Sequence, residues 1–397
     1  MTTLAPPTSL SRQPIELSRF PSNIQKFLDP NAPATVAQLV VRGVVPMPPL
    51  VRLCALYQIS HFGPEELRRE AADAVTSMPR ELIEPLLSQA LPGDILDWIA
   101  VLFCADVELI GALLANELTP LESLERLAST GEGPIIERLA LNQVRLLREP
   151  ILIQRLYFNT ALRPSSADRL LELAAREGVD LSWLPESEAL ISSIGEGRAH
   201  AGEEEDQLFQ ELHGPQGDRT GTTAGVSVSG LTQGSIGEEV PRATEQLVPR
   251  SKGAEGPTEG KRLTPAQRIQ KMNVSSKVRL ALLGNQSERA LLIRDANKVV
   301  SRAAIRSPAV SESEALLYAR NNALSADVIE YISKNKKWMR SYPIKVSIVM
   351  NPKTPAHTAL QYLTHLRPAD LNSIVRSHSV PSIVRQRAQA ILKARKG

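Results

Sequence analysis

The sequence predicts an all-α protein in which two α-solenoid-like helical-repeat blocks are joined by a long disordered linker. Apolar residues recur at three- and four-residue spacing along most of the chain, which is the period of an amphipathic helix. Aromatic residues make up only 4% of the sequence, while Leu, Ala, Arg and Glu, which keep side-chain freedom in a helix, are frequent. A Gly-rich segment, residues 196–262, separates the two periodic regions and interrupts their pattern.

The charge is divided unevenly along the chain, although the 397 residues together carry a formal charge of only +3. Residues 1–195 hold 16 Lys and Arg against 24 Asp and Glu, and residues 196–260 hold 5 against 12. Residues 261–397 hold 25 against 7, a net charge of +18. A charge of that size in one segment favours anionic partners. The length exceeds what one hydrophobic core usually serves, so we expect two domains.

The first 22 residues are expected to form a disordered tail. Residues 1–14 lack the basic cluster and apolar run of a signal peptide. The longest apolar stretch, residues 98–105, is far shorter than a membrane span, so we expect a cytoplasmic protein without such a span. The two cysteines, Cys54 and Cys104, form no ligand pair and are predicted to be buried thiols.

The acidic block, residues 23–195, is expected to contain a series of short helices. Two helix starts are marked by Thr119-Pro120 and by residues 165–168, where a hydroxyl can cap the first amides and proline suits the first turn. No segment alternates polar and apolar residues for long, so strands are not expected. The predicted helices include residues 81–90, 94–103, 121–127, 135–141 and 167–174.

The linker stands out by composition. Residues 196–260 carry 12 of the 22 glycines, together with Ser, Thr, Pro and Glu. Such a segment cannot bury enough apolar surface to offset the entropy of ordering its backbone, so we expect disorder. Within it, residues 206–212 place two leucines and Phe209 on one helical face, which predicts a transient helix, with a short docking helix as the alternative. Residues 247–251, Leu-Val-Pro-Arg-Ser, resemble a thrombin site.

The basic block, residues 263–397, contains a repeat at an offset of 43 residues. Aligning Ser311 with Thr354 brings apolar positions and a shared aspartate, Asp327 or Asp370, into register. In each copy a second helix is expected to start 14 residues after the first. Another apolar helix precedes each copy and is followed by a proline, which cannot continue the amide ladder and disfavours helix in the residue before it.

The same spacing recurs in the acidic block, from Asn116 to Asn159. Recurrence near one period in both blocks predicts stacked helical pairs, each too small to bury its own apolar face. Residues 351–355, Asn-Pro-Lys-Thr-Pro, resemble the phrase that precedes a Leu-rich helix in bacterial leucine-rich-variant repeats. Over residues 30–184 and 263–396 the chain is thus similar to HEAT-like and leucine-rich-variant α-helical repeat proteins. Some leucine-rich-variant proteins carry an iron–sulfur cluster, but two cysteines do not imply one here.

No catalytic motif of useful specificity is found, so we expect a protein that is not an enzyme and holds no cofactor or metal. Residues 256–261, Gly-Pro-Thr-Glu-Gly-Lys, lack the glycine spacing of a phosphate loop. The separations of the three histidines in the basic block match no ligand pattern. Asp327 and Asp370 are expected just inside helix starts, where a carboxylate stabilises the free amides. A HEAT-type DNA-modifying enzyme, using Asp327 near Tyr331, is the least favoured alternative.

The basic block favours a binding function. Cations interleaved with aromatic residues can contact phosphates and stack on bases, whereas an ordinary solvated helix face carries both signs of charge. An aromatic residue there can also simply pack in the core. The residues predicted to contact an anionic partner are Lys334, Lys336, Lys337, Trp338, Arg340, Lys345, Arg376, Arg385, Arg387, Lys393, Arg395 and Lys396.

Two functions follow as expectations. The first is a non-enzymatic scaffold or adaptor whose repeat surfaces hold protein partners, with the basic block contacting an anionic partner. The second is a nucleic-acid-binding protein that holds phosphates through the basic block. The anionic partner stays open among nucleic acid, acidic protein and membrane surface, and no small-molecule substrate is inferred. The acidic linker, residues 203–206 above all, is a candidate to fold back and compete with that partner.

Overall fold

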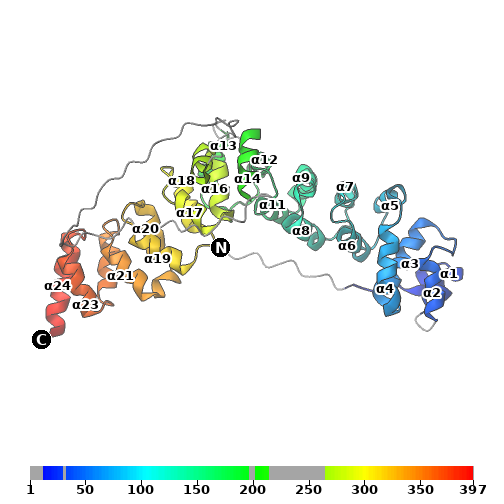
Figure 1. The fold of residues 1–397 in the computed structure, drawn as a ribbon, viewed down its shortest axis with the longest axis horizontal. Helices are drawn as coiled ribbons and strands as arrows, with labels where there is room; N and C mark the ends of the chain where they lie inside the picture. The colour runs from blue at the N-terminus through cyan, green and yellow to red at the C-terminus, as the bar shows by residue number, and fades with distance from the viewer. Residues whose placement is uncertain (1–11, 30–32, 196–201, 214–263, 397) are drawn as a thin grey trace, which may run out of the picture.

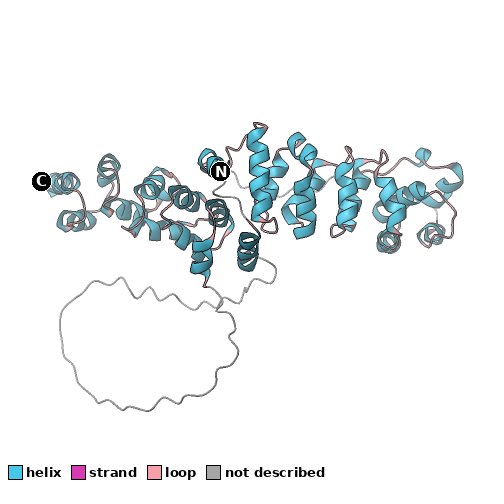
Figure 2. Cartoon of the chain, turned by 90° about the horizontal axis from the view of Figure 1, so that it is seen from above, coloured by secondary structure: helices cyan, strands magenta, loops and turns pink. Residues whose placement is uncertain are grey.

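The computed structural model of the chain describes residues 12–29, 33–195, 202–213 and 264–396. Within these ranges the backbone forms 24 α-helices and two short 3₁₀ helices, and no strand is present (Figure 2). The predicted all-α fold is therefore confirmed for the described part of the chain. The helices form one elongated, curved row with α1 near one end and α24 at the other (Figure 1).

The first part of the row precedes the predicted linker, and the second part begins inside it. The helices of the first part are η1 (Leu17–Arg19), α1 (Ser22–Leu28), α2 (Ala34–Val41), α3 (Pro49–Phe62), α4 (Glu65–Thr76), α5 (Arg80–Leu87), α6 (Gly93–Leu102), α7 (Val107–Ala115), α8 (Leu121–Thr130), α9 (Gly133–Leu141), α10 (Gln143–Arg148), α11 (Ile151–Tyr157), α12 (Pro164–Arg176) and α13 (Ser187–Gly195). Those of the second part are α14 (Glu203–His213), α15 (Pro265–Lys271), α16 (Val274–Leu283), α17 (Gln286–Leu292), α18 (Lys298–Arg306), α19 (Glu312–Arg320), α20 (Ala326–Lys334), η2 (Trp338–Arg340), α21 (Tyr342–Met350), α22 (Ala356–Leu363), α23 (Pro368–Arg376) and α24 (Ser382–Lys396).

The α-helices are short, from six to fifteen residues, and their starts are fixed by prolines or polar side chains. Asn285 and Ser311 each accept a hydrogen bond from the amide three residues on. The carboxylates of Glu288 and Glu314 in turn accept hydrogen bonds from the amides of Asn285 and Ser311, which completes two capping boxes. Such caps satisfy amides that the first helical turn leaves free, so a short helix can begin at a defined residue.

The predicted helices of the acidic block correspond to α5, α6, α8, α9 and α12, with boundaries within about three residues. The predicted hydroxyl caps are wrong at both helix starts. Helix α12 begins at Pro164 without a side-chain cap, and the hydroxyl of Ser165 donates to Asp206. Thr119 does not cap α8, because its hydroxyl donates to the carbonyl of Leu113 at 2.6 Å, back at the end of α7. Thr354 likewise donates to the carbonyl of Ile348 in α21. These threonines close the helix before them.

Helices that are close but not consecutive in the chain lie side by side, such as α5 with α7, α8 with α11, and α19 with α21. Asn116, Asn159 and Asn351 tie these neighbours together, since each side-chain amide donates to two carbonyls 27 to 32 residues earlier. The stacking step is therefore shorter than the predicted 43 residues. An offset of 43 relates α19 to α22, three helices along, so it matches helix positions but not packing partners.

One hydrophobic core cluster runs from Phe20, before α1, to Ile348 in α21, and a second runs from Val349 to Leu392. The first cluster includes residues on both sides of the predicted linker. Helices α12 and α13 pack directly against α16. The interruption of the core therefore falls inside α21, and the two predicted blocks share one core across the linker.

Arg279 of α16 forms much of this junction. Its side chain is fully buried and donates to the carbonyls of Tyr157, Asn159 and Leu162 at 3.1, 2.6 and 2.8 Å. Burial lowers the pKa of Arg279 to about 10, which still leaves the guanidinium protonated at neutral pH. The planar fork of donors matches the three carbonyls of one turn, so α16 is locked onto the end of α11.

Helix α14 corrects part of the predicted linker. Phe209 is completely buried and Leu208 is 7% exposed, because α14 packs against α12, α15 and α16. The guanidinium of Arg279 lies 4.8 Å from the ring centroid of Phe209. Residues 203–213 are therefore docked in the row, while residues 196–201 and 214–262 of the predicted linker lie outside the described residues.

Carboxylates of α14 also cap two helices of the row. Asp206 accepts hydrogen bonds from the amide and hydroxyl of Ser165 at 2.9 and 2.6 Å. Glu205 accepts from the amide of Asn273, which precedes α16, at 2.7 Å. Negative charge at a helix start is favourable to the free amides there. The acidic segment thus contacts the basic block at Asn273, whereas the predicted partner-binding residues begin at Lys334.

The predicted N-terminal tail is also shorter than expected. Of its 22 residues, 1–11 lie outside the described residues. The rest is packed, because Phe20 is 4% exposed and Ile15 and Leu17 lie against the same core cluster. Apolar side chains at these three positions hold the chain to α1 and α3 before the first full helix begins.

Candidate interaction surfaces

The C-terminal end of the row carries almost unopposed positive charge. From Asn335 to the last residue the sequence holds 12 Lys and Arg and a single acidic residue, Asp370. Asp370 accepts a hydrogen bond from the hydroxyl of Tyr342. Other acidic side chains of the basic block are paired earlier in the row, for example Glu314 with Arg289 at 2.9 Å. The surplus of cations is therefore concentrated in the last helices, from η2 to α24.

The predicted contact residues other than Trp338 comprise cations that are bound within the row, cations that are half-buried, and cations that are exposed. Lys334 forms an exposed ion pair with Glu330 at 2.6 Å. Arg395 donates to the carbonyls of Thr364 and Leu366 at 2.6 and 2.7 Å, so it closes a turn of the row. Lys345 and Arg385 are half-buried, and the side chain of Lys396 lies outside the described residues. The residues whose side chains remain exposed to a partner are Lys336, Lys337, Arg340, Arg376, Arg387 and Lys393.

Trp338 does not belong to the exposed surface. Its side chain is 7% exposed and meets the ring of Tyr331 edge-on, with centroids 6.1 Å apart. Tyr342 is covered as well, because the guanidinium of Arg367 lies 4.7 Å from its ring centroid. The predicted contact by Trp338 is therefore wrong, since the indole fills the core between α20 and α21. The sequence could not separate a stacking aromatic from a core aromatic.

Some cations of the row serve the fold. Four of them donate to carbonyls at least 26 residues earlier in the chain, and for three of these the separation is 26 to 31 residues, which is the stacking step. Composition does not reveal this role, because a cation that faces a turn counts the same as one that faces water. The carbonyl-binding cations are Arg145, Arg279, Lys353 and Arg395.

A second surface lies at the opposite end, where residues 12–16, which form no helix, lie against α3 and α6. Three polar side chains hold the backbone of this segment. Gln58 accepts from the amide of Ile15 at 2.8 Å, and Asp94 accepts from the amide of Gln13 at 2.9 Å. The hydroxyl of Tyr57 donates to the carbonyl of Gln13 at 3.1 Å. The sequence prediction missed this site, because residues 12–16 were assigned to the disordered tail.

The side chain of Arg12 enters a polar cluster on the same face. Its guanidinium donates to Nε2 of His61 at 2.6 Å and lies 3.8 Å from the carboxylate of Asp97. Asp97 is also held by Ser123 at 2.7 Å and by Arg126 at 2.5 Å. Asp97 is 2% exposed, so this cluster is a built feature of the row.

His61 is neutral in this arrangement. Burial lowers the pKa of His61 below its usual range, and the charges of Arg12 and Arg68 lower it further. The bond from the His61 ring to the carbonyl of Tyr57, and the charge of Asp97, act in the opposite direction. A neutral ring that donates from Nδ1 to Tyr57 leaves Nε2 free to accept from Arg12.

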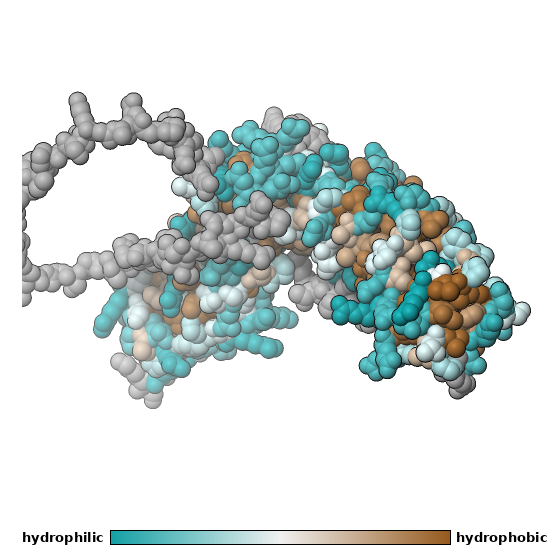
Figure 3. Space-filling model, turned by 45° about the vertical axis from the view of Figure 1, so that its right-hand side comes forward, coloured by the Kyte–Doolittle hydropathy of each residue, from teal (hydrophilic) through white to brown (hydrophobic). Residues whose placement is uncertain are grey.

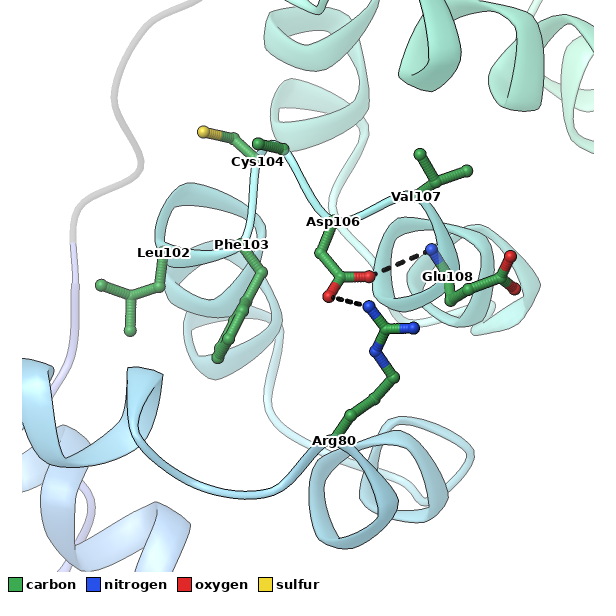
Figure 4. A pocket seen from close by; sticks show the side chains of 8 residues that line it. Arg80, Leu102, Phe103, Cys104, Asp106, Val107 and Glu108 are labelled. Atoms are coloured by element: carbon green, nitrogen blue, oxygen red, sulfur yellow. Dashed lines mark hydrogen bonds and ion pairs between the residues drawn. The ribbon is translucent and has the colours of Figure 1, made fainter.

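A hollow of about 510 Å³ lies where α5, α6 and α7 meet (Figure 4). Asp106 caps α7 there and accepts from Arg80 at 2.7 Å. Burial raises the pKa of Asp106, but hydrogen bonds from the amide of Leu109 and from Arg80 outweigh it, and the net pKa is lowered. The polar groups of the hollow thus satisfy one another, which is the behaviour of a helix cap.

The two cysteines differ from each other. Cys54 is partly buried, and burial raises the pKa of its thiol to about 11. Cys104 is exposed at the rim of the hollow, in the turn that follows α6 (Figure 4). The predicted burial is therefore wrong for Cys104, because the apolar stretch of residues 98–105 continues beyond the end of α6 at Leu102.

Asp327, the candidate acid of an enzyme, lies in the first turn of α20 as expected. Its carboxylate is 3.3 Å from Arg302, which also pairs with Glu186 at 3.1 Å. Hydrogen bonding to Asp327 raises the pKa of Arg302. Within the described residues, no group of three His, Cys, Asp or Glu side chains could hold a metal ion.

Apolar side chains gather on the surface near the N-terminal end of the row (Figure 3). Leu39 and Val44, in α2 and the loop after it, are 40% and 65% exposed. No helix in the described part of the chain is long and apolar enough to cross a membrane.

A scan against models of known protein families, and searches of curated proteins and of solved structures, found no match to this chain. The function must therefore be argued from the surfaces that the row presents. Two surfaces are considered, namely the basic end from η2 to α24, which is defined by its exposed cations, and the face around Asp94 and Asp97, which binds residues 12–16.

Proposed function

We propose that the chain is a non-enzymatic scaffold or adaptor of the HEAT-like, α-solenoid kind, which binds protein partners and contacts an anionic partner with its basic C-terminal end. Rows of helix pairs present long, regular surfaces, and such surfaces commonly serve protein binding. The charge of the last helices is the observation that carries the proposal. From Asn335 onward the sequence holds 12 Lys and Arg but a single acidic residue, Asp370. The carboxylate of Asp370 accepts a hydrogen bond from the hydroxyl of Tyr342.

A nucleic acid is the second candidate for the anionic partner. Phosphates would suit the same surplus of cations. Base stacking has less support, because Trp338 is buried and the ring of Tyr342 is covered by Arg367. Binding of a nucleic acid would then depend on its phosphates and show little sequence preference.

The test is a salt titration of binding to three labelled polyanions: a DNA duplex, a single-stranded RNA and poly-glutamate. The full chain is compared with a triple variant, Lys336→Ala, Lys337→Ala and Arg340→Ala. We expect binding at low salt that weakens linearly on a log–log plot. Removal of three phosphate contacts would reduce the slope for DNA by about 2 to 3.

A matched control carries the same charge change elsewhere, at three exposed arginines of the acidic block, Arg69, Arg169 and Arg176. This control should bind like the unmodified chain. Absence of binding to all three polyanions at low salt would overturn the anionic-partner proposal. Equal losses in the triple variant and the control would assign binding to net charge and not to the C-terminal end.

A further inference from the structure

We infer that the face of α3 and α6 around Tyr57, His61, Asp94 and Asp97 is a binding site for an extended, arginine-bearing segment of a partner protein, and that residues 12–16 occupy it in cis. The inference rests on the proposed scaffold function and names the chemistry of one partner. Side chains of α3 and α6 bind residues 12–16 of the same chain on this face.

Side chains of the row hold the backbone of residues 12–16. Both polar groups of the Gln13 backbone are bound by side chains of the row, the amide by Asp94 and the carbonyl by Tyr57. Gln58 takes the next free amide, that of Ile15. Side chains that bind backbone groups recognise an extended chain whatever its sequence, as in strand-addition modes of peptide recognition, where side-chain pockets supply the selectivity.

The row also provides a pocket for one side chain of the segment. Arg12 reaches between His61 of α3 and Asp97 of α6. The ring of His61 stacks near Tyr57, with centroids 4.7 Å apart, and meets Trp98 edge-on at 5.4 Å. A planar cation between an imidazole acceptor and a buried carboxylate is a selective arrangement for arginine. The half-buried side chain of Ile15 adds an apolar position three residues on.

Residues 12–16 can be displaced from this face. Gln13, Pro14 and Glu16 are exposed, and the side chain of Arg12 is 35% exposed. If Arg12 left, Asp97 would keep its bonds to Ser123 and Arg126. The site would then open without an unpaired buried carboxylate, which is the main cost of breaking a buried ion pair.

The occupant follows from these contacts and from charge. A partner segment needs an arginine, an extended backbone over the next three residues, and an apolar side chain at the third of them. The acidic block carries a net charge of −8 over residues 1–195, which favours a basic segment. Residues 12–16 then compete with the partner segment for the site, so only a partner that binds more tightly than residues 12–16 can displace them.

The experiment uses the full chain and a fluorescein-labelled peptide with the sequence of residues 12–20 as the probe. A double variant, Arg12→Ala and Ile15→Ala, weakens the cis segment. We expect this variant to bind the probe at least 10-fold more tightly than the unmodified chain, because a tethered competitor is present at an effective concentration of about millimolar. A probe with glutamate in place of its first arginine should not bind.

Two further substitutions in the double variant test the site itself. Asp94→Ala removes a half-buried acceptor, and His61→Phe keeps a ring but removes the acceptor for arginine. Each should weaken probe binding at least 10-fold, while thermal unfolding followed by circular dichroism confirms that the variants are folded. Equal probe affinity for the unmodified chain and the double variant, or no effect of either substitution, would overturn the inference.

The outcome is separable from that of the proposed function. Polyanion binding by the C-terminal end should be the same in all of these variants, so it can succeed where probe binding fails. Concentration-dependent dimers of the unmodified chain that the double variant does not form would assign the occupant to a second copy, and would overturn the commitment to another protein.

A pH series adds a readout that a purely structural role would not move. Protonated His61 cannot accept from arginine and repels it, while Arg68 adds repulsion and Asp97 attraction. The pKa of His61 is lowered with Arg12 in place, so binding of an arginine is favoured above that pKa and is lost as the pH falls through it. Probe affinity should decrease as the pH is lowered in the double variant, and should change less when His61→Phe is added.

Discussion

Asn351 shows how a single side chain connects two neighbouring helices of the row, α21 and α19. Its amide donates to the carbonyls of Ala319 and Asn321, while its oxygen accepts from the amide of Lys353 at 3.0 Å. Replacement by alanine would leave buried carbonyls without donors. We expect Asn351→Ala to lower the free energy of unfolding by about 2 kcal/mol, measured by urea denaturation.

Asn321 is the matched control for this prediction. Its oxygen accepts from the amide of Ala323 at 2.9 Å, the same local turn as in Asn351. No bond from its side-chain amide to a neighbouring repeat is found within the described residues. Asn321→Ala should therefore cost about 0.5 kcal/mol or less. Similar costs for the two variants would show that the local turn, and not the link between repeats, is what stabilises the row.

The sequence predicted where the residues of a recurring phrase lie better than it predicted which hydrogen bonds their side chains make. The phrase at residues 351–355 was recognised as a repeat marker, yet the donors of Asn351 and the backward bond of Thr354 depend on a helix that lies next to them only after stacking. Trp338 is a similar case, since its neighbours come from two helices. Contacts of this kind have no signal within a short window of sequence.

Among the elements, α14 differs most from its prediction. A window with eight acidic or polar residues out of eleven suggests solvated chain, but Phe209 supplies an anchor that is buried where α14 packs against α12, α15 and α16. We expect Phe209→Ala to raise the rate of amide hydrogen exchange in residues 203–213 at least about 100-fold, which corresponds to about 3 kcal/mol of lost docking energy.

Gln207, an exposed residue of the same helix, provides the control. Gln207→Ala should leave exchange in α14 unchanged, because it removes no packing. Fast exchange throughout residues 203–213 in the unmodified chain would mean that the helix is not docked. The core positions of helices such as α8 and α12 were predictable because their apolar period extends over two or more turns.

For the whole molecule, the junction at Arg279 predicts how the chain responds to cleavage. Residues 247–251 resemble a thrombin site, so thrombin offers a cut after Arg250 between the two predicted blocks. The structure adds that both fragments contribute to one core, and that Glu186 pairs across the junction with Arg302 and Arg306 at 3.1 and 2.8 Å. The cut chain should therefore elute as one particle in size-exclusion chromatography.

Arg279→Met should weaken this association, because the carbonyls of Tyr157, Asn159 and Leu162 lose their donors. The cut variant is expected to separate at protein concentrations where the unmodified cut chain stays together. An exposed control, Arg387→Met, should behave like the unmodified chain. Free separation of the unmodified fragments would contradict the continuous core.

Helices α14 and α15 contact each other, so the two ends of the stretch from residue 214 to residue 264 are held close together. Lengthening a stretch whose ends are held together costs little, since each doubling of its length adds only about 0.6 kcal/mol of closure entropy. The middle of the chain is thus a natural insertion point, where a fluorescent protein or a second binding module could be grafted while the helices on either side keep their register.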